Sequence, residues 1–252
     1  MFKLVIFLCF PLLISTNNNP TIYLVGDSTM ATKPIEDNPE RGWGQVLPLF
    51  FGNELTFENH AKNGKSTKSF IQQGLWKNVL DKLKPGDYVF IQFGHNDQKI
   101  SDTTRYAEAH TLYKRNLIKY VNETREKGAA PVLLTPVNRR KFDKEGKFVD
   151  QHGDYPAVVR EVAVQMNVPL IDVHKKSEKV FAELGDDKTK DIFLWIPPNK
   201  YKSLPEGKTD NTHFSFEGAV LVAGLVVEGI KEIELPIARY LIKNPTIQIG
   251  GK

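Results

Sequence analysis

Short apolar runs alternate with amphipathic stretches along most of the chain. The apolar runs are rich in β-branched and aromatic residues, as buried strands are, whereas the amphipathic stretches repeat with the period of a helix. The runs expected to form strands are 21–25, 55–59, 88–93, 131–135 and 169–173. Helices are expected over 42–51, 66–73, 75–83, 106–127, 155–166, 174–184 and 217–233, followed by a packed tail at 237–242. Because strands that alternate with helices form parallel sheets covered by helices, the pattern predicts an α/β fold with a five-stranded parallel sheet.

Polar residues follow directly after the first predicted strand. The apolar run 21–25 stops at Gly26, and Ser28 stands two positions later, where a buried strand would release the chain into a loop. Ligands of open parallel sheets bind beyond the carboxyl ends of the strands, so Ser28 would face a cleft at the rim of the sheet. A plain turn is the alternative interpretation of these residues.

Similar polar clusters end the next two strands. Asn63-Gly64-Lys65-Ser66 follows the second strand, and Gly94-His95-Asn96-Asp97 follows the third. The Gly-Lys-Ser of the first cluster does not form a phosphate-binding loop, because that motif needs a glycine where this chain has Asn59. We therefore interpret Gly64 as the glycine of a tight turn, where bare backbone N–H can approach a ligand.

A long polar excursion occupies residues 136–156. It is expected to contain a hairpin with its tip at 144–147 and Phe142 and Phe148 on its arms. Long loops in compact domains usually serve function, so His152 within the excursion is a candidate substrate contact. Trp43 is a second candidate, since it could stack on a sugar ring, although a buried tryptophan is the alternative.

Composition is that of an ordinary globular protein. The chain has 252 residues, of which 40% are hydrophobic and 25% are charged, and one large domain accounts for this length. The net charge of +4 is spread along the chain, and the basic stretch 138–141 is interpreted as a solvated loop. No nucleic-acid partner is expected, because no aromatic or helical basic stripe accompanies that stretch.

The N-terminus resembles an export signal. Lys3 precedes an apolar run, 4–14, that is too short to span a bilayer, and a polar stretch follows the run. We expect a signal peptide over 1–16, a mature domain over 17–252, and a secreted or periplasmic protein without other membrane attachment. An uncleaved anchor is the alternative. Cys9 is the only cysteine, so the mature chain would hold no disulfide, thiolate metal site or cysteine nucleophile.

The chain offers every group that acyl transfer requires. Ser28 can act as the nucleophile, His213 as the base that takes its proton, and Asp210 as the carboxylate that orients the imidazole. The backbone N–H groups of Ser28 and Gly64 and the side-chain amide of Asn96 could form an oxyanion hole. The other histidines (His60, His95, His110 and His174) have no metal-ligand spacing, and we interpret them as structural or solvated.

These residues together resemble a known superfamily. The chain is identified as a member of the SGNH (GDSL) hydrolases, whose four blocks match, in order, Gly26-Asp27-Ser28, the glycine of Asn63-Gly64, Gly94-His95-Asn96-Asp97 and Asp210-Asn211-Thr212-His213. The stretches 94–97, 135–140 and 152–156 are similar to those of the rhamnogalacturonan acetylesterase branch.

The resemblance implies a three-layer α/β/α sandwich like that of flavodoxin. It also implies a serine esterase without metal or cofactor that removes acetyl groups from pectic rhamnogalacturonan, and we expect this enzyme to be a monomer. Two alternatives stay open. One is an esterase of the same fold that acts on xylan, a lipid or a thioester, and the other is a glycan-binding protein without catalysis.

Overall fold

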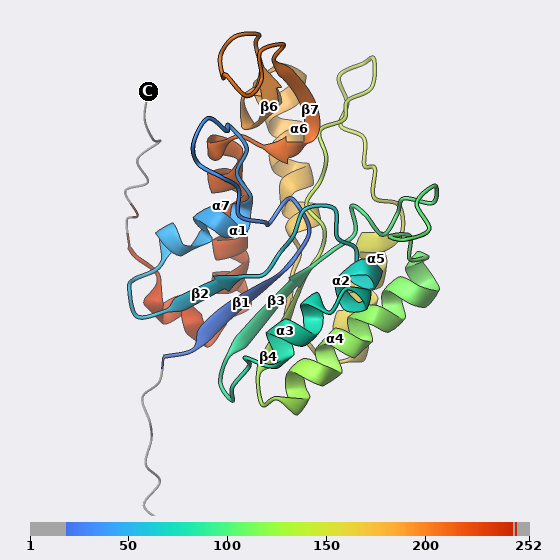
Figure 1. Cartoon of the computed structure of the whole chain (residues 1–252), viewed down its shortest axis with the longest axis vertical. Helices are drawn as coiled ribbons and strands as arrows, with labels where there is room; N and C mark the ends of the chain where they lie inside the picture. Colours follow the sequence, from blue (N-terminus) through green and yellow to red (C-terminus); the bar gives the residue numbers. More distant parts are fainter. Residues whose placement is uncertain (1–18, 244, 246–252) are drawn as a thin grey trace, which may run out of the picture.

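The main sheet has five parallel strands in the order β2-β1-β3-β4-β5 (Figure 1). The structure, a computed structural model, describes residues 19–243 and 245. The strands are β1 (Thr21–Gly26), β2 (Thr56–Asn59), β3 (Tyr88–Gln92), β4 (Ala130–Leu134) and β5 (Leu170–Ile171). This order is the flavodoxin-like one, in which ligands bind where the direction of strand addition reverses, beyond the ends of β1 and β3. The predicted α/β fold with a five-stranded parallel sheet is confirmed.

Helices cover both faces of this sheet (Figure 1). Helices α1, α6 and α7 pack against one face, and α2 to α5 pack against the other. The helices are α1 (Trp43–Val46), α2 (Thr67–Gln72), α3 (Leu75–Leu80), α4 (Lys114–Glu126), α5 (Tyr155–Gln165), α6 (Val173–Ile192) and α7 (Phe216–Glu232). The three layers that the resemblance implies are therefore present.

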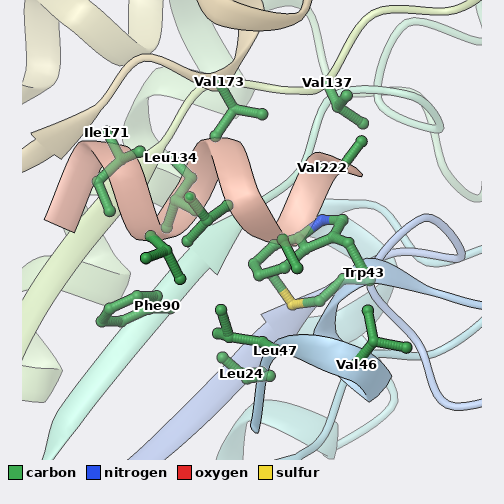
Figure 2. Close-up of a cluster of buried hydrophobic side chains, with 14 of the residues drawn as sticks. Leu24, Trp43, Val46, Leu47, Phe90, Leu134, Val137, Ile171, Val173 and Val222 are labelled. Carbon is green, nitrogen blue, oxygen red and sulfur yellow. The ribbon is translucent and has the colours of Figure 1, made fainter. Parts of the chain in front are cut away.

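The two cores follow from the alternation of side chains along each strand. In β1, Ile22 and Leu24 point to the face covered by α7, whereas Tyr23 and Val25 point to the opposite face. Figure 2 shows Leu24 and Val222 of α7 in the first of these cores. Full burial of one such side chain contributes about 1.5–3 kcal/mol to the free energy of folding. The two cores therefore hold the strands, and with them the strand ends where the polar clusters begin.

A two-stranded antiparallel ribbon lies outside the main sheet and was not predicted. It consists of β6 (Phe193–Ile196) and β7 (Lys208–Phe214). No strand was predicted between residues 184 and 217, and this is wrong for 193–196 and 208–214. The error has a physical reason, because β7 is mostly polar and only partly buried, and it lacks the apolar alternation that marks a strand.

Three predicted helices have different boundaries in the structure. The stretch 42–51 divides into α1 and a 3-10 turn (Leu47–Phe50) with Pro48 in its first turn. The stretch 106–127 begins with a π turn (Ala109–Tyr113) before α4. Helix α6 continues past 184 to Ile192, with a kink at Gly185, whose φ is 75° and ψ is 178°. The predicted tail at 237–242 packs as a 3-10 turn (Pro236–Tyr240).

The predicted excursion after β4 is present, and it projects from the same end of the sheet as the β6–β7 ribbon (Figure 1). Phe142 and Phe148 pair across its arms with ring centroids 5.6 Å apart, and Gly146 at the tip has a φ of 78°. The predicted hairpin is confirmed.

The expected signal peptide, with Cys9 inside it, lies outside the described residues. Within residues 19–243, no helix is both long and apolar enough to cross a bilayer. The same part of the chain contains no cluster of three or more histidine, cysteine, aspartate or glutamate side chains arranged to hold a metal ion.

Candidate active site

Ser28 lies in a tight turn at the end of β1 that the side chain of Asp27 holds in place. Oδ1 of Asp27 accepts hydrogen bonds from the backbone N–H of Thr29 at 2.9 Å and from its hydroxyl at 2.8 Å. A Cβ at Gly26 would lie 2.7 Å from the carbonyl oxygen of Gln92, so only glycine fits beside β3 at this point. Ser28 retains 8% of its surface exposed. The local sequence therefore presents the hydroxyl of Ser28 beyond the end of β1.

His213 contacts both Ser28 and Asp210. Its Nε2 lies 2.9 Å from Oγ of Ser28, and its Nδ1 lies 2.8 Å from Oδ2 of Asp210. A carboxylate accepts the Nδ1 hydrogen, which leaves Nε2 free to accept the hydroxyl hydrogen of Ser28. The structure thus brings together the three side chains that the sequence analysis assigned to nucleophile, base and orienting carboxylate.

Asp210 is held as an anion beside the imidazole. Burial alone would raise its pKa, but hydrogen bonds from the His213 ring and from the backbone N–H groups of Thr212 and His213 bring the pKa well below its usual range. Nζ of Lys208 lies 3.2 Å from Oδ2 of the same carboxylate. An anionic Asp210 fixes the tautomer of His213 and stabilises an imidazolium when it forms.

The loops that carry Gly64 and Asn96 are tied to the end of β1 and to each other. The backbone N–H of Lys62 donates to the carbonyl of Gly26 at 3.1 Å, and Gly64 adopts a left-handed turn with a φ of 73°. The side-chain amide of Asn96 donates to the carbonyl of Lys65 at 2.9 Å. Both candidate oxyanion donors therefore belong to segments anchored at the edge of the sheet where Ser28 lies.

A chain of charged side chains, which the sequence analysis missed, connects the Gly64 loop with Asp210. The buried ammonium of Lys33 donates to the side-chain oxygen of Asn63 and pairs with Glu40 at 2.6 Å. Glu40 lies 3.7 Å from Lys208, which contacts Asp210. No sequence motif marks this chain of contacts, because its members come from separate loops that only the tertiary structure brings together.

Asp27 pairs with His95 behind Ser28. Oδ2 of Asp27 lies 3.1 Å from Nδ1 of His95, and both side chains are buried. Burial alone would raise the pKa of Asp27, but the interaction with His95 and the hydrogen bonds from Thr29 lower it to about 2. Burial lowers the pKa of His95, although Asp27 opposes this shift. His95 is therefore a buried partner of Asp27, which places it among the structural histidines that were expected from the sequence.

Asp97 is a buried carboxyl group with one oxygen unused. Its Oδ1 accepts hydrogen bonds from the backbone N–H of Thr67 at 2.9 Å and from its hydroxyl at 2.5 Å. Within the described residues, Oδ2 has no hydrogen-bond partner. Burial raises the pKa of Asp97 to about 8, against the opposing effect of Thr67. The side chain is thus protonated at neutral pH and ties α2 to the Asn96 loop.

The two predicted substrate contacts have other roles in the structure. Trp43 is fully buried against the sheet, and its indole N–H donates to Oε1 of Gln92 at 2.8 Å. His152 is also buried, and its ring nitrogens lie 2.9 Å from the side-chain oxygen of Gln98 and 2.9 Å from the carbonyl of Val137. Neither side chain has a free surface for a sugar, so both predictions are corrected. The alternative of a buried tryptophan is the one that holds.

The sequence is similar to a known family and to characterised proteins. A family model described as the GDSL-like Lipase/Acylhydrolase family matches residues 24–219. The chain is 40% identical over 223 residues to the rhamnogalacturonan acetylesterase RhgT of Bacillus subtilis, a match that covers 88% of this chain and 94% of RhgT. It is 39% identical to the probable rhamnogalacturonan acetylesterase YesY of the same organism, over 88% of this chain and 98% of YesY.

Solved structures share the fold. The protein YxiM of Bacillus subtilis superposes with a TM-score of 0.74 and 27% identity, over 86% of this chain and 58% of that one. The acetylxylan esterase Axe2 of Geobacillus stearothermophilus superposes with a TM-score of 0.60 and 16% identity, over 90% of this chain and 98% of that one. At this low identity, the likeness to Axe2 concerns the fold alone.

Proposed function

Because the chain belongs to the GDSL-like lipase/acylhydrolase family and is a carboxylic ester hydrolase, we propose that it removes O-acetyl groups from pectic rhamnogalacturonan through a Ser-His-Asp triad. The position of His213 between Ser28 and Asp210 carries the mechanistic part of this proposal. The identity of 40% to a rhamnogalacturonan acetylesterase and of 39% to a probable one, over nearly their whole length, supports the substrate.

The proposed reaction has two halves. His213 Nε2 takes the hydroxyl proton of Ser28 while Oγ attacks the acetyl carbonyl carbon. The imidazolium then gives this proton to the sugar oxygen as the ester bond breaks, which leaves an acetyl group on Ser28. In the second half, His213 takes a proton from water, the resulting hydroxide attacks the acetyl carbon, and the proton returns to Oγ as acetate leaves. Asp210 stabilises the imidazolium in both halves.

Three donors are proposed to stabilise the negative oxygen of each tetrahedral intermediate. They are the backbone N–H groups of Ser28 and Gly64 and the second amide hydrogen of Asn96, since the first is donated to Lys65. Donors held by backbone turns and by a fixed side chain need little reorganisation when the charge develops, which is the condition under which such groups are most effective.

A comparison of three substrates distinguishes this proposal from an esterase of the same fold that acts on another ester. Acetate release should be measured on acetylated rhamnogalacturonan, acetylated xylan and a long-chain ester, with the Ser28→Ala variant as the inactive control. We expect the highest kcat/KM on rhamnogalacturonan. A preference for xylan or for the long-chain ester would reject the substrate, and acetate release that persists in Ser28→Ala would reject the mechanism. A wild-type protein that binds glycan but releases no acetate would be a binding protein.

Export of this enzyme is also proposed, on the sequence pattern of residues 1–19. Expression of the full chain, followed by N-terminal sequencing of protein recovered from the periplasm and the medium, tests it. A mature N-terminus near residue 17 is expected, whereas an intact Met1 on membrane-bound protein would indicate an uncleaved anchor.

A further inference from the structure

Arg139 lies between the loop that carries Asn96 and the strand that carries Asp210 and His213. The backbone N–H of the next residue, Arg140, donates to the carbonyl of Asn211 at 2.8 Å, between Asp210 and His213 in β7. The guanidinium of Arg139 itself donates through Nη2 to the carbonyl of His95 at 3.0 Å, next to Asn96. One end of this residue is thus adjacent to the triad strand, and its other end is adjacent to the Asn96 loop.

The guanidinium of Arg139 lacks the carboxylate partner that nearby arginines have. Within residues 19–243, the bond to His95 is the only hydrogen bond that it donates, and no carboxylate oxygen lies within 4.0 Å of it. Three other arginines at this end of the sheet or near it are paired: Arg105 with Asp102, Arg140 with Asp186 and Arg160 with Asp172. Since a guanidinium carries five N–H groups, most of the donors of Arg139 are unused.

The setting of Arg139 makes an anionic ligand favourable. Its side chain is partly buried, and burial lowers its pKa while Asp27 and Asp210 oppose this shift from a distance. A partly desolvated cation without a partner gains more from an incoming anion than an exposed one does. Lys99 lies on the same edge, where Arg105 and Arg139 both act on it electrostatically, so the local field favours negative charge.

We propose that Arg139 binds a galacturonate carboxylate of the substrate beside the scissile acetyl ester. This inference rests on the proposed function, because rhamnogalacturonan carries a carboxylate on every galacturonic acid unit. The xylose units of xylan and simple acetyl esters carry none. The planar fork of a guanidinium matches the two oxygens of a carboxylate, and it contributes orientation as well as affinity. Arg139 is thereby a specificity-determining residue for an acidic polysaccharide.

The test removes the charge from the enzyme and from the substrate in turn. The substrates are an acetylated rhamnogalacturonan oligosaccharide with free carboxylates and the same oligosaccharide with those carboxylates methyl-esterified. Acetate release gives kcat/KM for each, and the ratio of the two values cancels any general effect of a substitution on turnover. The enzymes are the wild type, Arg139→Gln, Arg139→Lys and the control Arg125→Gln. Arg125 is also bound only to backbone carbonyls, those of Met166 and Asn167, but it is exposed near the C-terminal end of α4.

We expect the wild type and Arg125→Gln to favour the free acid by about 10-fold to 100-fold. Arg139→Gln should bring the ratio close to 1, and Arg139→Lys should give an intermediate ratio, which also serves if Arg139→Gln does not fold. A wild-type ratio near 1, or an unchanged ratio in both Arg139 variants, overturns the inference while acetate release upholds the proposed function. A wild type that releases no acetate from either oligosaccharide overturns both.

Discussion

The side-chain amide of Asn96 donates a hydrogen bond to the backbone carbonyl of Lys65, 2.9 Å away. The two residues are 31 positions apart in the sequence, and Lys65 directly follows Gly64. The bond fixes the orientation of the amide and leaves its second hydrogen available. Two candidate oxyanion donors from different strand ends are thus held together by one contact.

Asn96→Ala should lower kcat by roughly 10² to 10³ fold, because one oxyanion donor typically contributes about 3 kcal/mol to transition-state stabilisation. Steady-state kinetics on a small acetyl ester measures the loss, and thermal unfolding checks that the variant is folded. Near-normal turnover in a folded variant would remove Asn96 from the oxyanion hole.

Ser28→Ala should nearly abolish hydrolysis of the same ester, because the variant has no hydroxyl to form the acyl-enzyme. A fluorophosphonate probe followed by peptide mapping gives an independent measurement. The wild type should be labelled at Ser28 and the variant should not be labelled. Labelling of another serine, or retained activity in Ser28→Ala, contradicts the assignment of the nucleophile.

The convergence of the site could be predicted from the sequence because it follows from the sheet. Ser28, Gly64 and Asn96 come after three parallel strands, and parallel strands bring their carboxyl ends to one edge. The continuous apolar runs of β1 and β3, which are buried on both faces, were long enough to show which residues follow the strands. His213 was assigned from the spacing of Asp210 to His213 and from the resemblance, without knowledge of the ribbon that carries it.

Features set by long-range contacts of polar residues could not be predicted. In the β6–β7 ribbon, β7 is mostly polar, and the register of its pairing with β6 shifts at a bulge between Phe193 and Leu194. The contacts of Lys33 and of Asp97 depend on loops that meet only after folding. His152 and Trp43 carried side chains suited to sugar binding, but burial decided their roles, and a residue's burial in a loop or a short helix leaves little trace in a single sequence.

Trp43→Phe should destabilise the fold rather than weaken substrate binding. The substitution leaves a cavity under α7 and removes the donor to Gln92, and together these cost about 2–4 kcal/mol. Urea unfolding measures the loss of free energy, and KM for acetylated rhamnogalacturonan should stay within about twofold of the wild-type value. A large rise in KM with unchanged stability would restore Trp43 as a substrate contact.

Lys33→Met should weaken the chain of contacts between the Gly64 loop and Asp210. The change leaves Glu40 and Asn63 without their buried cation, and since Glu40 keeps Lys208 nearby, we expect a loss of about 2 kcal/mol in the free energy of unfolding. The control is Lys77→Met, whose ion pair with Asp81 is exposed on α3 and should contribute less than about 0.5 kcal/mol. Equal stability of the two variants in urea would show that the buried contacts of Lys33 add nothing.

Asp97 should make the stability of the protein fall as the pH rises. Its pKa is about 8 in the folded state against 3.8 for an ordinary aspartate, so between these values the folded chain holds a proton that the unfolded chain has lost. The stabilising contribution is therefore complete below about pH 3.8 and is lost as the pH rises toward 8, by at most about 1.4 kcal/mol per pH unit.

Asp97→Asn mimics the protonated carboxyl group at every pH, since the amide oxygen can still accept from Thr67. Urea unfolding of the variant and the wild type at pH 5, 6, 7 and 8 should show the variant gaining stability relative to the wild type at each step. The control Asp81→Asn, an exposed carboxylate on the surface, should keep a constant difference from the wild type across the series. A constant difference for Asp97→Asn as well would mean that Asp97 is ionised in the folded protein, and its buried oxygen would then need a partner that holds the charge.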